Sequence, residues 1–501
     1  MHAAPMFRRL SAQILLGCVS LALPAWVNAD VRLPALFTDH MVLQQGKPIS
    51  VWGWANHGEQ ITVEFAGQKA TTVAKEGHWI VKLPRQPAND QPAVLRVTGR
   101  NTVEVNDILV GEVWVCSGQS NMEWPMSRSE NPDAAINSSA NPNIRLFTVP
   151  KRRSPAPVDD IKSQWVACGP ETVRSFSAVA YFFGRDLQKA RGVPIGLIHT
   201  SWGGSPAEVW VADDVLKNHP AYRRDIVDAY FPVLQRWANT PQGGPPWQPS
   251  ELYNGMIAPL LQYGIAGAIW YQGESNAGRA WQYRSLFADM ISNWRRDFKQ
   301  GNFPFLCVQL APWDRNKKRS IEEITKAPTE SDWAELREAQ NYVVKKLPKV
   351  GVAIITDVGD KDDIHPAKKE PVGSRLALLA RKIAYSERGL IPTGPSYRRQ
   401  MVASGKIAVY FNNAGKKLTQ DGERLTGFAI AGEDRKWHWA DAVIDPDRKN
   451  RVWVSSPAVP EPVAVRYGWS DYPVVNLKNS EGLPASPFRS DWWPATTLNS
   501  R

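Results

Sequence analysis

The chain has 501 residues, 43% of them hydrophobic, and its 60 Lys and Arg against 49 Asp and Glu give a formal net charge of +11. This length exceeds one compact core and predicts several domains. Its short basic clusters, at 151–153 and 317–319, are not interleaved with aromatic residues, which argues against a nucleic-acid-binding protein. The basic excess would favour anionic polysaccharides as partners.

Residues 1–29 have the composition of a secretory signal peptide. Arg8 and Arg9 precede an apolar run at 10–23, and small residues end the segment at Ala29. The run is too short for a transmembrane helix, and no other stretch is long and apolar enough to span a bilayer. The alternative is a lipoprotein signal with an acylated Cys18, although apolar residues continue beyond it. We therefore expect an exported protein, periplasmic or secreted, with no membrane span.

Residues 30–106 predict an N-terminal domain resembling a β-sandwich. Apolar and polar residues alternate there in short segments, as in half-buried strands, and turns rich in Gly, Asn and Pro separate the segments. The segments lie at 49–54, 61–65, 78–83 and 93–97.

Residues 107–391 alternate between apolar runs and helical patterns. Continuous apolar runs are typical of strands buried on both faces, and strand–helix alternation predicts a parallel sheet between two layers of helices. The runs lie at 108–116, 194–199, 265–271, 303–310 and 350–356. Helical patterns occupy 178–190 and 286–294, and two more helices begin near Asp332, with Glu335 as a capping-box residue, and at Pro371.

Residues 392–501 return to short alternating segments and predict a C-terminal β-rich domain. The clearest strands lie at 406–411, 451–455 and 462–467, between turns rich in Gly, Asn and Asp.

Three cysteines follow the signal segment: Cys116, Cys168 and Cys307. Their odd number and wide spacing argue against a disulfide framework, although the sequence leaves a Cys116–Cys168 bridge open. The chain has no CxxC, HExxH or His-rich cluster, so we expect no metal site.

Polar residues follow four of the predicted strands of the central region. They are Ser120 in GQSNM (118–122), TSWGGS (200–205), QGESN (272–276) and DVGDKDDIHP (357–366). The carboxyl ends of parallel strands meet at one edge of a sheet, where open α/β folds bind ligands. The four loops together therefore predict an active site on a rigid scaffold.

The residue types in these loops are those of acyl transfer, which needs a nucleophile, a base, an orienting carboxylate and oxyanion donors. Ser120 is the candidate nucleophile, and His365 is the candidate base, with His199 as its rival. Asp362 or Asp363 would orient the imidazole. The candidate oxyanion donors are the backbone of Gly203 or Gly204 and the side-chain amide of Gln272 or Asn276.

Four motifs in this order resemble the SGNH hydrolases, and specifically the sialate O-acetylesterase-like carbohydrate esterases: GQSNM, SWGG, WYQGESN and DxxH. DHMVLQQ (39–45) and GLPASPF (482–488) extend the resemblance over nearly all of the chain after the signal segment. It implies a flavodoxin-like three-layer fold and a Ser–His–Asp esterase that removes O-acetyl groups from sugars without a metal or an organic cofactor. It also implies an oxyanion hole from Ser120, Gly204 and Gln272.

The motif around Ser120, GxSxM, departs from the GxSxG elbow of α/β-hydrolases and favours the SGNH type. The DxxH spacing points to Asp362, whereas relatives keep an acid at the position of Asp363. We expect an O-acetylated carbohydrate, from sialate or plant polysaccharides, as the substrate. Candidates for binding it are Asn121, Trp202, Glu274 and Asn276, with Trp124, Trp210 and Trp270 as further candidates for stacking on sugars.

Two alternatives remain at this level. The chain could be a non-catalytic carbohydrate-binding protein with an inactive esterase core, or an acyl hydrolase for other esters, such as a lipase or peptidase. No long exposed apolar stretch near Ser120 points to a lipase. The oligomeric state is not evident from the sequence.

Overall fold

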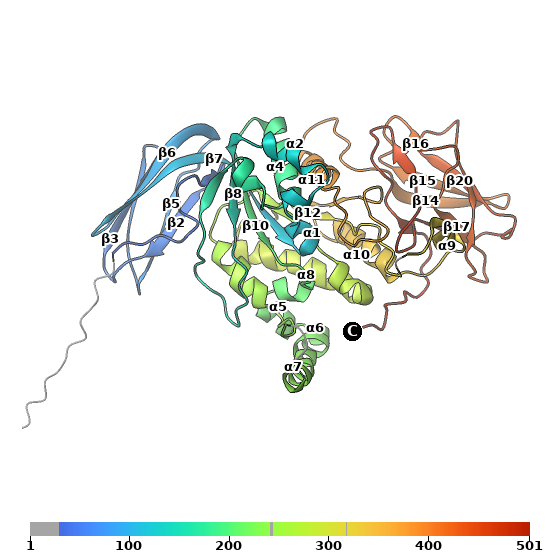
Figure 1. Cartoon of the computed structure of the whole chain (residues 1–501), viewed down its shortest axis with the longest axis horizontal. Helices are drawn as coiled ribbons and strands as arrows, with labels where there is room; N and C mark the ends of the chain where they lie inside the picture. The colour runs from blue at the N-terminus through green and yellow to red at the C-terminus, as the bar shows by residue number, and fades with distance from the viewer. Residues whose placement is uncertain (1–29, 241–243, 317) are drawn as a thin grey trace, which may run out of the picture.

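Three parts follow one another along the long axis of the molecule (Figure 1), with β-strands at both ends and an α/β region between them. The computed structural model describes residues 30–240, 244–316 and 318–501. The predicted signal peptide at 1–29, with Cys18, lies outside the described residues.

The N-terminal part consists of two small sheets packed face to face. Strands β2 and β5 form one antiparallel pair, and β3 pairs with β4 and β6 in the other sheet. Ile61, Val63 and Phe65 of β3 are buried between the sheets, as their alternation predicts. The strands are β1 (Val42–Gln44), β2 (Ile49–Trp54), β3 (Gln60–Phe65), β4 (Gln68–Val73), β5 (His78–Leu83) and β6 (Asn89–Thr98).

The strand β7 (Thr102–Gly118) belongs to both the N-terminal and the central part. Its first half pairs with β6 and β1, and its second half pairs in parallel with β10 and β11. The predicted boundary between residues 106 and 107 therefore falls inside one continuous strand. Because the strand is shared, the apolar core of the N-terminal part continues into the central part.

The central sheet has the order β13-β12-β11-β7-β10-β8-β9. All of its neighbouring pairs are parallel except β8 with β9. The remaining strands are β8 (Asn141–Thr148), β9 (Trp165–Cys168), β10 (Ile195–Ser201), β11 (Gly267–Tyr271), β12 (Phe305–Val308) and β13 (Val350–Ala353).

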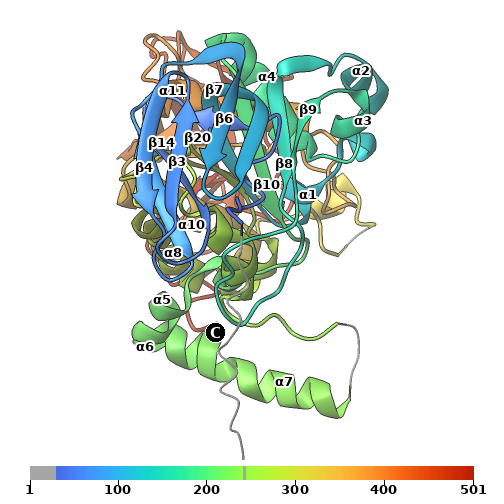
Figure 2. The ribbon, with the colours of Figure 1, turned by 90° about the vertical axis from the view of Figure 1, so that its left-hand side faces the viewer.

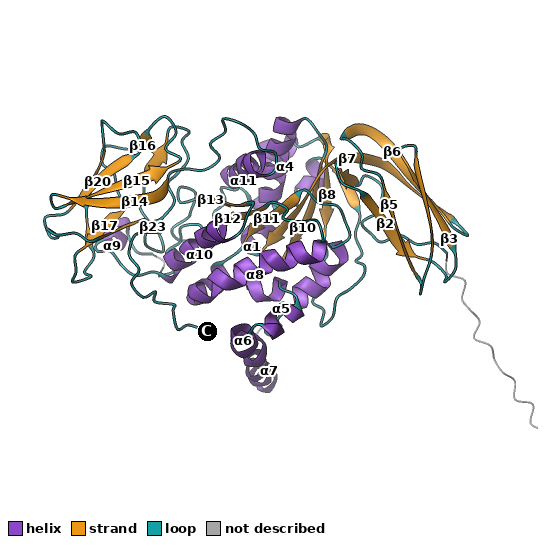
Figure 3. Cartoon of the chain, turned by 180° about the vertical axis from the view of Figure 1, so that it is seen from behind, coloured by secondary structure: helices purple, strands orange, loops and turns teal. Residues whose placement is uncertain are grey.

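Helices cover both faces of this sheet (Figure 3). The side chains of β7 alternate between two cores: Trp114 and Cys116 pack with helices α4 and α11, and Val113 and Val115 lie in the core that includes α8 and α10. This arrangement confirms the predicted three-layer α/β fold. The four helices are α4 (Ala178–Arg191), α8 (Ala280–Phe298), α10 (Asp332–Lys346) and α11 (Glu370–Ile383).

Shorter helices follow β10 and β12. They are α5 (Asp213–Asn218), α6 (Pro220–Tyr222), α7 (Ala229–Asn239) and α9 (Ile321–Thr325). Figure 2 shows α7 extending away from the rest of the molecule, and none of its residues is buried.

The start of α10 differs from the prediction. The N-cap is Ser331, whose hydroxyl accepts a hydrogen bond from the Ala334 N–H, so Glu335 is one position too far along to close a capping box. The Glu335 carboxylate instead accepts the backbone N–H groups of Thr496 and Thr497. The side chain thus holds the C-terminal segment against the central part.

The C-terminal part contains two four-stranded and one two-stranded antiparallel sheets around its own core. Their orders are β14-β15-β20-β19, β18-β17-β21-β23 and β16-β22. The strands are β14 (Ser396–Ala403), β15 (Lys406–Asn412), β16 (Leu418–Gln420), β17 (Phe428–Ala431), β18 (His438–Trp439), β19 (Asp441–Ile444), β20 (Arg451–Ser455), β21 (Ala464–Tyr467), β22 (Leu477–Asn479) and β23 (Phe488–Arg489).

Cys116, Cys168 and Cys307 are buried free thiols, so the disulfide that the sequence left open does not form in this structure. In the described part of the chain, no helix combines the length and the apolar character needed to cross a bilayer.

We predict that Gly111→Ala destabilises the protein, because β7 passes too close to the chain before β10 at this point. A Cβ atom on Gly111 would lie 2.0 Å from the Pro194 carbonyl oxygen. Relieving such an overlap typically costs about 1–3 kcal/mol, which thermal unfolding would detect as a lower Tm. The control is Gly169→Ala, where the backbone is extended and no atom lies within 4 Å of the added Cβ. Equal Tm values for the two variants would contradict the close contact between Gly111 and Pro194 as the cause of the destabilisation.

Candidate active site

The loops predicted to carry the site start from neighbouring strand ends. Strand β7 lies between β10 and β11, and Gly118 at its end is in register with Ser201 on one side and Tyr271 on the other. Gly118 has a φ of 142°, and a Cβ there would lie 2.2 Å from the Tyr271 carbonyl oxygen. Only glycine fits this turn, which directs the chain into the short helix α1 (Ser120–Glu123).

Ser120 and His365 meet at this edge although 245 positions separate them in the chain. The Ser120 Oγ lies 2.8 Å from the His365 Nε2. Ser120 is the first residue of α1, and His365 lies in the loop between β13 and α11. This distance is that of a hydrogen bond between a nucleophile and its base.

The two candidate carboxylates point to different partners. The Asp363 Oδ1 lies 3.5 Å from the His365 Nδ1 and accepts the His365 backbone N–H at 2.8 Å. The Asp362 Oδ1 instead lies 2.5 Å from the Lys361 Nζ and accepts the Lys318 N–H at 3.2 Å. The structure therefore brings Asp363, and not Asp362, to the imidazole.

The His365 ring is held in a partly desolvated position. Its face stacks on Trp124, with the ring centroids 5.3 Å apart and the planes at 18°. Burial lowers the pKa of His365, and the nearby charges of Lys369 and Arg128 lower it further, against the opposing effect of Asp363. The imidazole is therefore neutral at neutral pH, the form that accepts a proton.

Backbone N–H groups near Ser120 are the best candidate donors to an anion. As the first residue of α1, Ser120 has an N–H with no intrahelical acceptor. The Gly203 N–H donates to the Glu123 Oε2 at 2.6 Å, whereas no hydrogen bond of the Gly204 N–H is found within the described chain. Of the two glycines, Gly204 therefore has the available donor.

The Gln272 side chain does not lie open to a ligand as the resemblance implied. It is fully buried, and its amide nitrogen donates to the Ser205 carbonyl and to the Asn276 Oδ1, at 3.3 and 2.6 Å. Its oxygen accepts the Tyr283 hydroxyl. Gln272 would have to exchange one of these partners to donate to an oxyanion.

A buried polar cluster, formed by Asn121, Lys369 and Glu274, joins three of the loops beneath Ser120. The Asn121 amide donates to the Glu274 Oε1 at 2.7 Å and to the carbonyl of Ile364, the residue before His365, at 3.1 Å. Its oxygen accepts the Lys369 Nζ at 2.5 Å. The loops of the serine and the histidine are thus tied together behind the Ser120–His365 contact.

Sequence reasoning missed Lys369, which is only 1% exposed. Burial disfavours the charged form of both groups. It therefore lowers the pKa of Lys369 to about 7 and raises the pKa of Glu274. The only signal for Lys369 in the sequence is weak: it lies four residues after His365. The residues around it, AKKE (367–370), have the composition of an ordinary solvated segment.

Most of the side chains predicted to bind substrate are internal. Asn121 and Asn276 are buried, and the Glu274 carboxylate faces Asn121. Trp210 and Trp270 are fully buried and pack edge to face with one another, so neither stacks on a sugar.

Among the tryptophan candidates, Trp202 lies partly open at the edge. Its ring packs against Trp247 at 5.4 Å and lies 5.5 Å from the Lys151 Nζ. It therefore remains a candidate surface for a sugar.

The rival base His199 has a different partner. Its Nε2 lies 2.6 Å from the Ser201 Oγ, and burial lowers its pKa to about 4. It is a neutral core histidine. Among the described residues, no three His, Cys, Asp or Glu side chains gather as they would around a metal ion.

A family model described as a carbohydrate esterase, sialic acid-specific acetylesterase, matches residues 110–378. A sialate O-acetylesterase from Mus musculus is 29% identical over 515 residues, which are 91% of this chain and 94% of the mouse protein. The Homo sapiens sialate O-acetylesterase is 28% identical over 518 residues, 95% of this chain and 96% of its own.

A solved structure, a carbohydrate acetylesterase from Xanthomonas citri, is 39% identical. The match covers 93% of this chain and 100% of the Xanthomonas chain, with a TM-score of 0.81. The range matched by the family model contains the loops of both Ser120 and His365.

We predict that Lys369→Met raises the pKa of His365. Lys369 carries its proton below about pH 7, and this positive charge lowers the histidine pKa. NMR of 13C-labelled histidine would follow the titration, with His365→Gln to assign the signal among the eight histidines. Lys369→Arg, which keeps the charge, should move the pKa less. An unchanged pKa in Lys369→Met would contradict the electrostatic coupling.

Proposed function

Because the chain belongs to the sialic acid-specific acetylesterase family of carbohydrate esterases, we propose that it is an exported serine esterase that removes O-acetyl groups from sialic acids. The observation that carries the mechanism is the 2.8 Å contact between the Ser120 Oγ and the His365 Nε2 at the open edge of the parallel sheet. Export rests on the signal-like segment at 1–29 and would place the enzyme in the periplasm or outside the cell.

Acylation begins with a proton transfer from the Ser120 Oγ to the His365 Nε2. The oxygen attacks the acetyl carbonyl carbon, and the carbonyl oxygen becomes an oxyanion. In this proposal the N–H groups of Ser120 and Gly204 stabilise this charge. His365 then donates its proton to the sugar oxygen as the ester bond breaks, leaving the acetyl group on Ser120 and a free sugar hydroxyl.

Deacylation repeats these steps with water. His365 takes a proton from the water as it attacks the acetyl-enzyme, and the proton returns to the Ser120 Oγ when acetate leaves. Asp363 orients the imidazole and favours the imidazolium that forms in each half-reaction. Stacking on Trp124 limits rotation of the same ring.

The charges at the rim favour an acidic sugar as the substrate. The Arg128 guanidinium lies 3.9 Å over the Trp124 ring, is exposed, and has no acidic partner within the described chain. A guanidinium recognises a carboxylate through two parallel hydrogen bonds, and a sialic acid carries a carboxylate that neutral sugars lack. Acetylated plant polysaccharides are the second substrate class to compare.

The two neighbouring aspartates allow a matched test. We predict that Asp363→Asn lowers kcat by a factor of about 10² to 10⁴, as loss of an orienting carboxylate does in other triads. It should also move the acid limb of kcat/KM to lower pH, because Asp363 raises the pKa of His365. Asp362→Asn should change kcat little, since Asp362 faces Lys361. A larger loss in Asp362→Asn would assign the role to that residue instead.

We predict that the wild-type protein hydrolyses p-nitrophenyl acetate and that Ser120→Ala lowers kcat by about 10⁴ or more. Acetate release from O-acetylated sialic acid and from acetylated xylan, with Ser120→Ala as the blank, compares the two substrate classes. Wild-type protein without turnover on any acetyl ester would support the alternative of a non-catalytic binding protein.

A further inference from the structure

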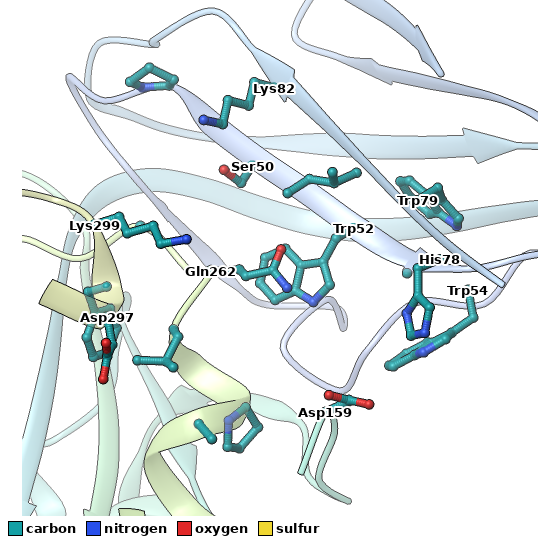
Figure 4. Close-up of a pocket in the computed structure, with 18 of the residues that line it drawn as sticks. Ser50, Trp52, Trp54, His78, Trp79, Lys82, Asp159, Gln262, Asp297 and Lys299 are labelled. Carbon is teal, nitrogen blue, oxygen red and sulfur yellow. The ribbon is translucent and has the colours of Figure 1, made fainter. Parts of the chain in front are cut away.

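A large cleft lies between the N-terminal strands and the central part (Figure 4). Strands β2 and β5 form one wall, and residues 258–264 with the end of α8 form the other. Its volume of about 1220 Å³ exceeds the roughly 300–1,000 Å³ of typical small-molecule sites. The cleft is therefore large enough for an extended ligand, and none of its lining residues belongs to the Ser120 site.

The strand wall of the cleft carries apolar side chains where a solvent-facing sheet usually carries polar ones. Alternate residues of β2 and β5 face the cleft in the pairs Ser50 with Lys82, Trp52 with Ile80, and Trp54 with His78. Ile80 is 46% exposed and Trp54 is partly exposed, whereas Trp52 is largely buried at the floor of the cleft, and Val51 and Val81 belong to the core. A concave surface with exposed apolar and aromatic side chains is typical of a binding site.

The cleft also carries an excess of positive charge. Lys75, Lys82 and Lys299 are exposed lining residues and form no ion pair with any described residue. Lys47 also lines the cleft and donates to the Ile265 carbonyl. Of the two carboxylates in the lining, Asp159 faces the cleft and Asp297 is paired with Arg296. The cations therefore outnumber the acids, which attracts an anionic ligand.

We propose that this cleft binds an acidic oligosaccharide, with its sugar rings on the Trp54 and Ile80 wall and its carboxylates at Lys82 and Lys299. Sugar rings expose C–H faces that pack on aromatic and aliphatic side chains, and their carboxylates pair with ammonium groups. A neutral oligosaccharide would use only the first kind of contact. A single small anion would leave most of the cleft empty.

One segment of chain connects the cleft to the site of Ser120. The connection between β8 and β9 touches both places. Its Lys151 pairs with Glu123, which ends the short helix α1 that Ser120 begins. Its Asp159, eight residues later, lines the cleft. Eight residues of chain span at most about 29 Å. This bound is compatible with one long glycan that reaches from the cleft to Ser120, a role that rests on the proposed esterase function.

The test uses full-length Ser120→Ala protein, so that bound glycans are not altered, and calorimetric titration with a de-O-acetylated sialic acid hexamer. The variant Lys82→Ser/Lys299→Ser should weaken binding roughly tenfold or more, and added salt should weaken wild-type binding. Trp54→Ala should weaken it without changing the salt dependence. The matched control is Lys345→Ser/Lys406→Ser, which removes two exposed lysines elsewhere and should bind normally.

A galacturonic acid hexamer and a neutral xylose hexamer complete the test. Binding of either acidic hexamer that depends on Lys82 and Lys299 supports the proposal and identifies the acid. Equal binding by the cleft variant and its control, or equally tight binding of the neutral hexamer, overturns it. Turnover of p-nitrophenyl acetate by the cleft variant with Ser120 intact should equal that of wild type. Absence of that turnover in wild type would count against the esterase proposal alone.

Discussion

The parallel pairing of β7 with β10 on one side and β11 on the other is the constraint on which the site depends. Backbone ladders fix the register, so Gly118, Ser201 and Tyr271 end their strands at the same level. The loop carrying His365 follows β13, at the far edge of the same sheet, and reaches back to Ser120. Polar residues that are distant in the chain become neighbours because their strands are neighbours.

The pairing of the strands determines where the loops begin. A buried polar cluster then holds the loop of Ser120 against the loop of His365. Asn121 follows the nucleophile and binds Lys369, Glu274 and the carbonyl of Ile364. Burying an ammonium and a carboxylate costs free energy, which the hydrogen bonds through Asn121 offset. The same lysine adds a positive charge near His365 and helps to keep that ring neutral. The cluster thus links the geometry of the site to its electrostatics.

The shared strand β7 also determines how the N-terminal part sits. Because one continuous strand belongs to both sheets, the N-terminal strands cannot rotate freely against the central part, and their cores merge. The cleft between β2, β5 and the end of α8 is a consequence of this fixed arrangement. Lys47, Lys75, Lys82 and Lys299 are scattered in the sequence and come together in this cleft, so the two short basic clusters along the chain do not indicate it.

The sequence by itself determined the elements and the residue types of the site. Continuous apolar runs identified β7, β10, β11, β12 and β13, because a strand buried on both faces has no polar side to show. Motifs singled out Ser120 and His365. Only the tertiary structure shows that Asp363 lies beside the imidazole and Asp362 beside Lys361, that Gln272 and Asn276 are buried, and that Lys369 joins the site. The physical reason is that side-chain direction, burial and the partner of a hydrogen bond depend on contacts between segments far apart in the chain, and spacing along one loop does not encode them.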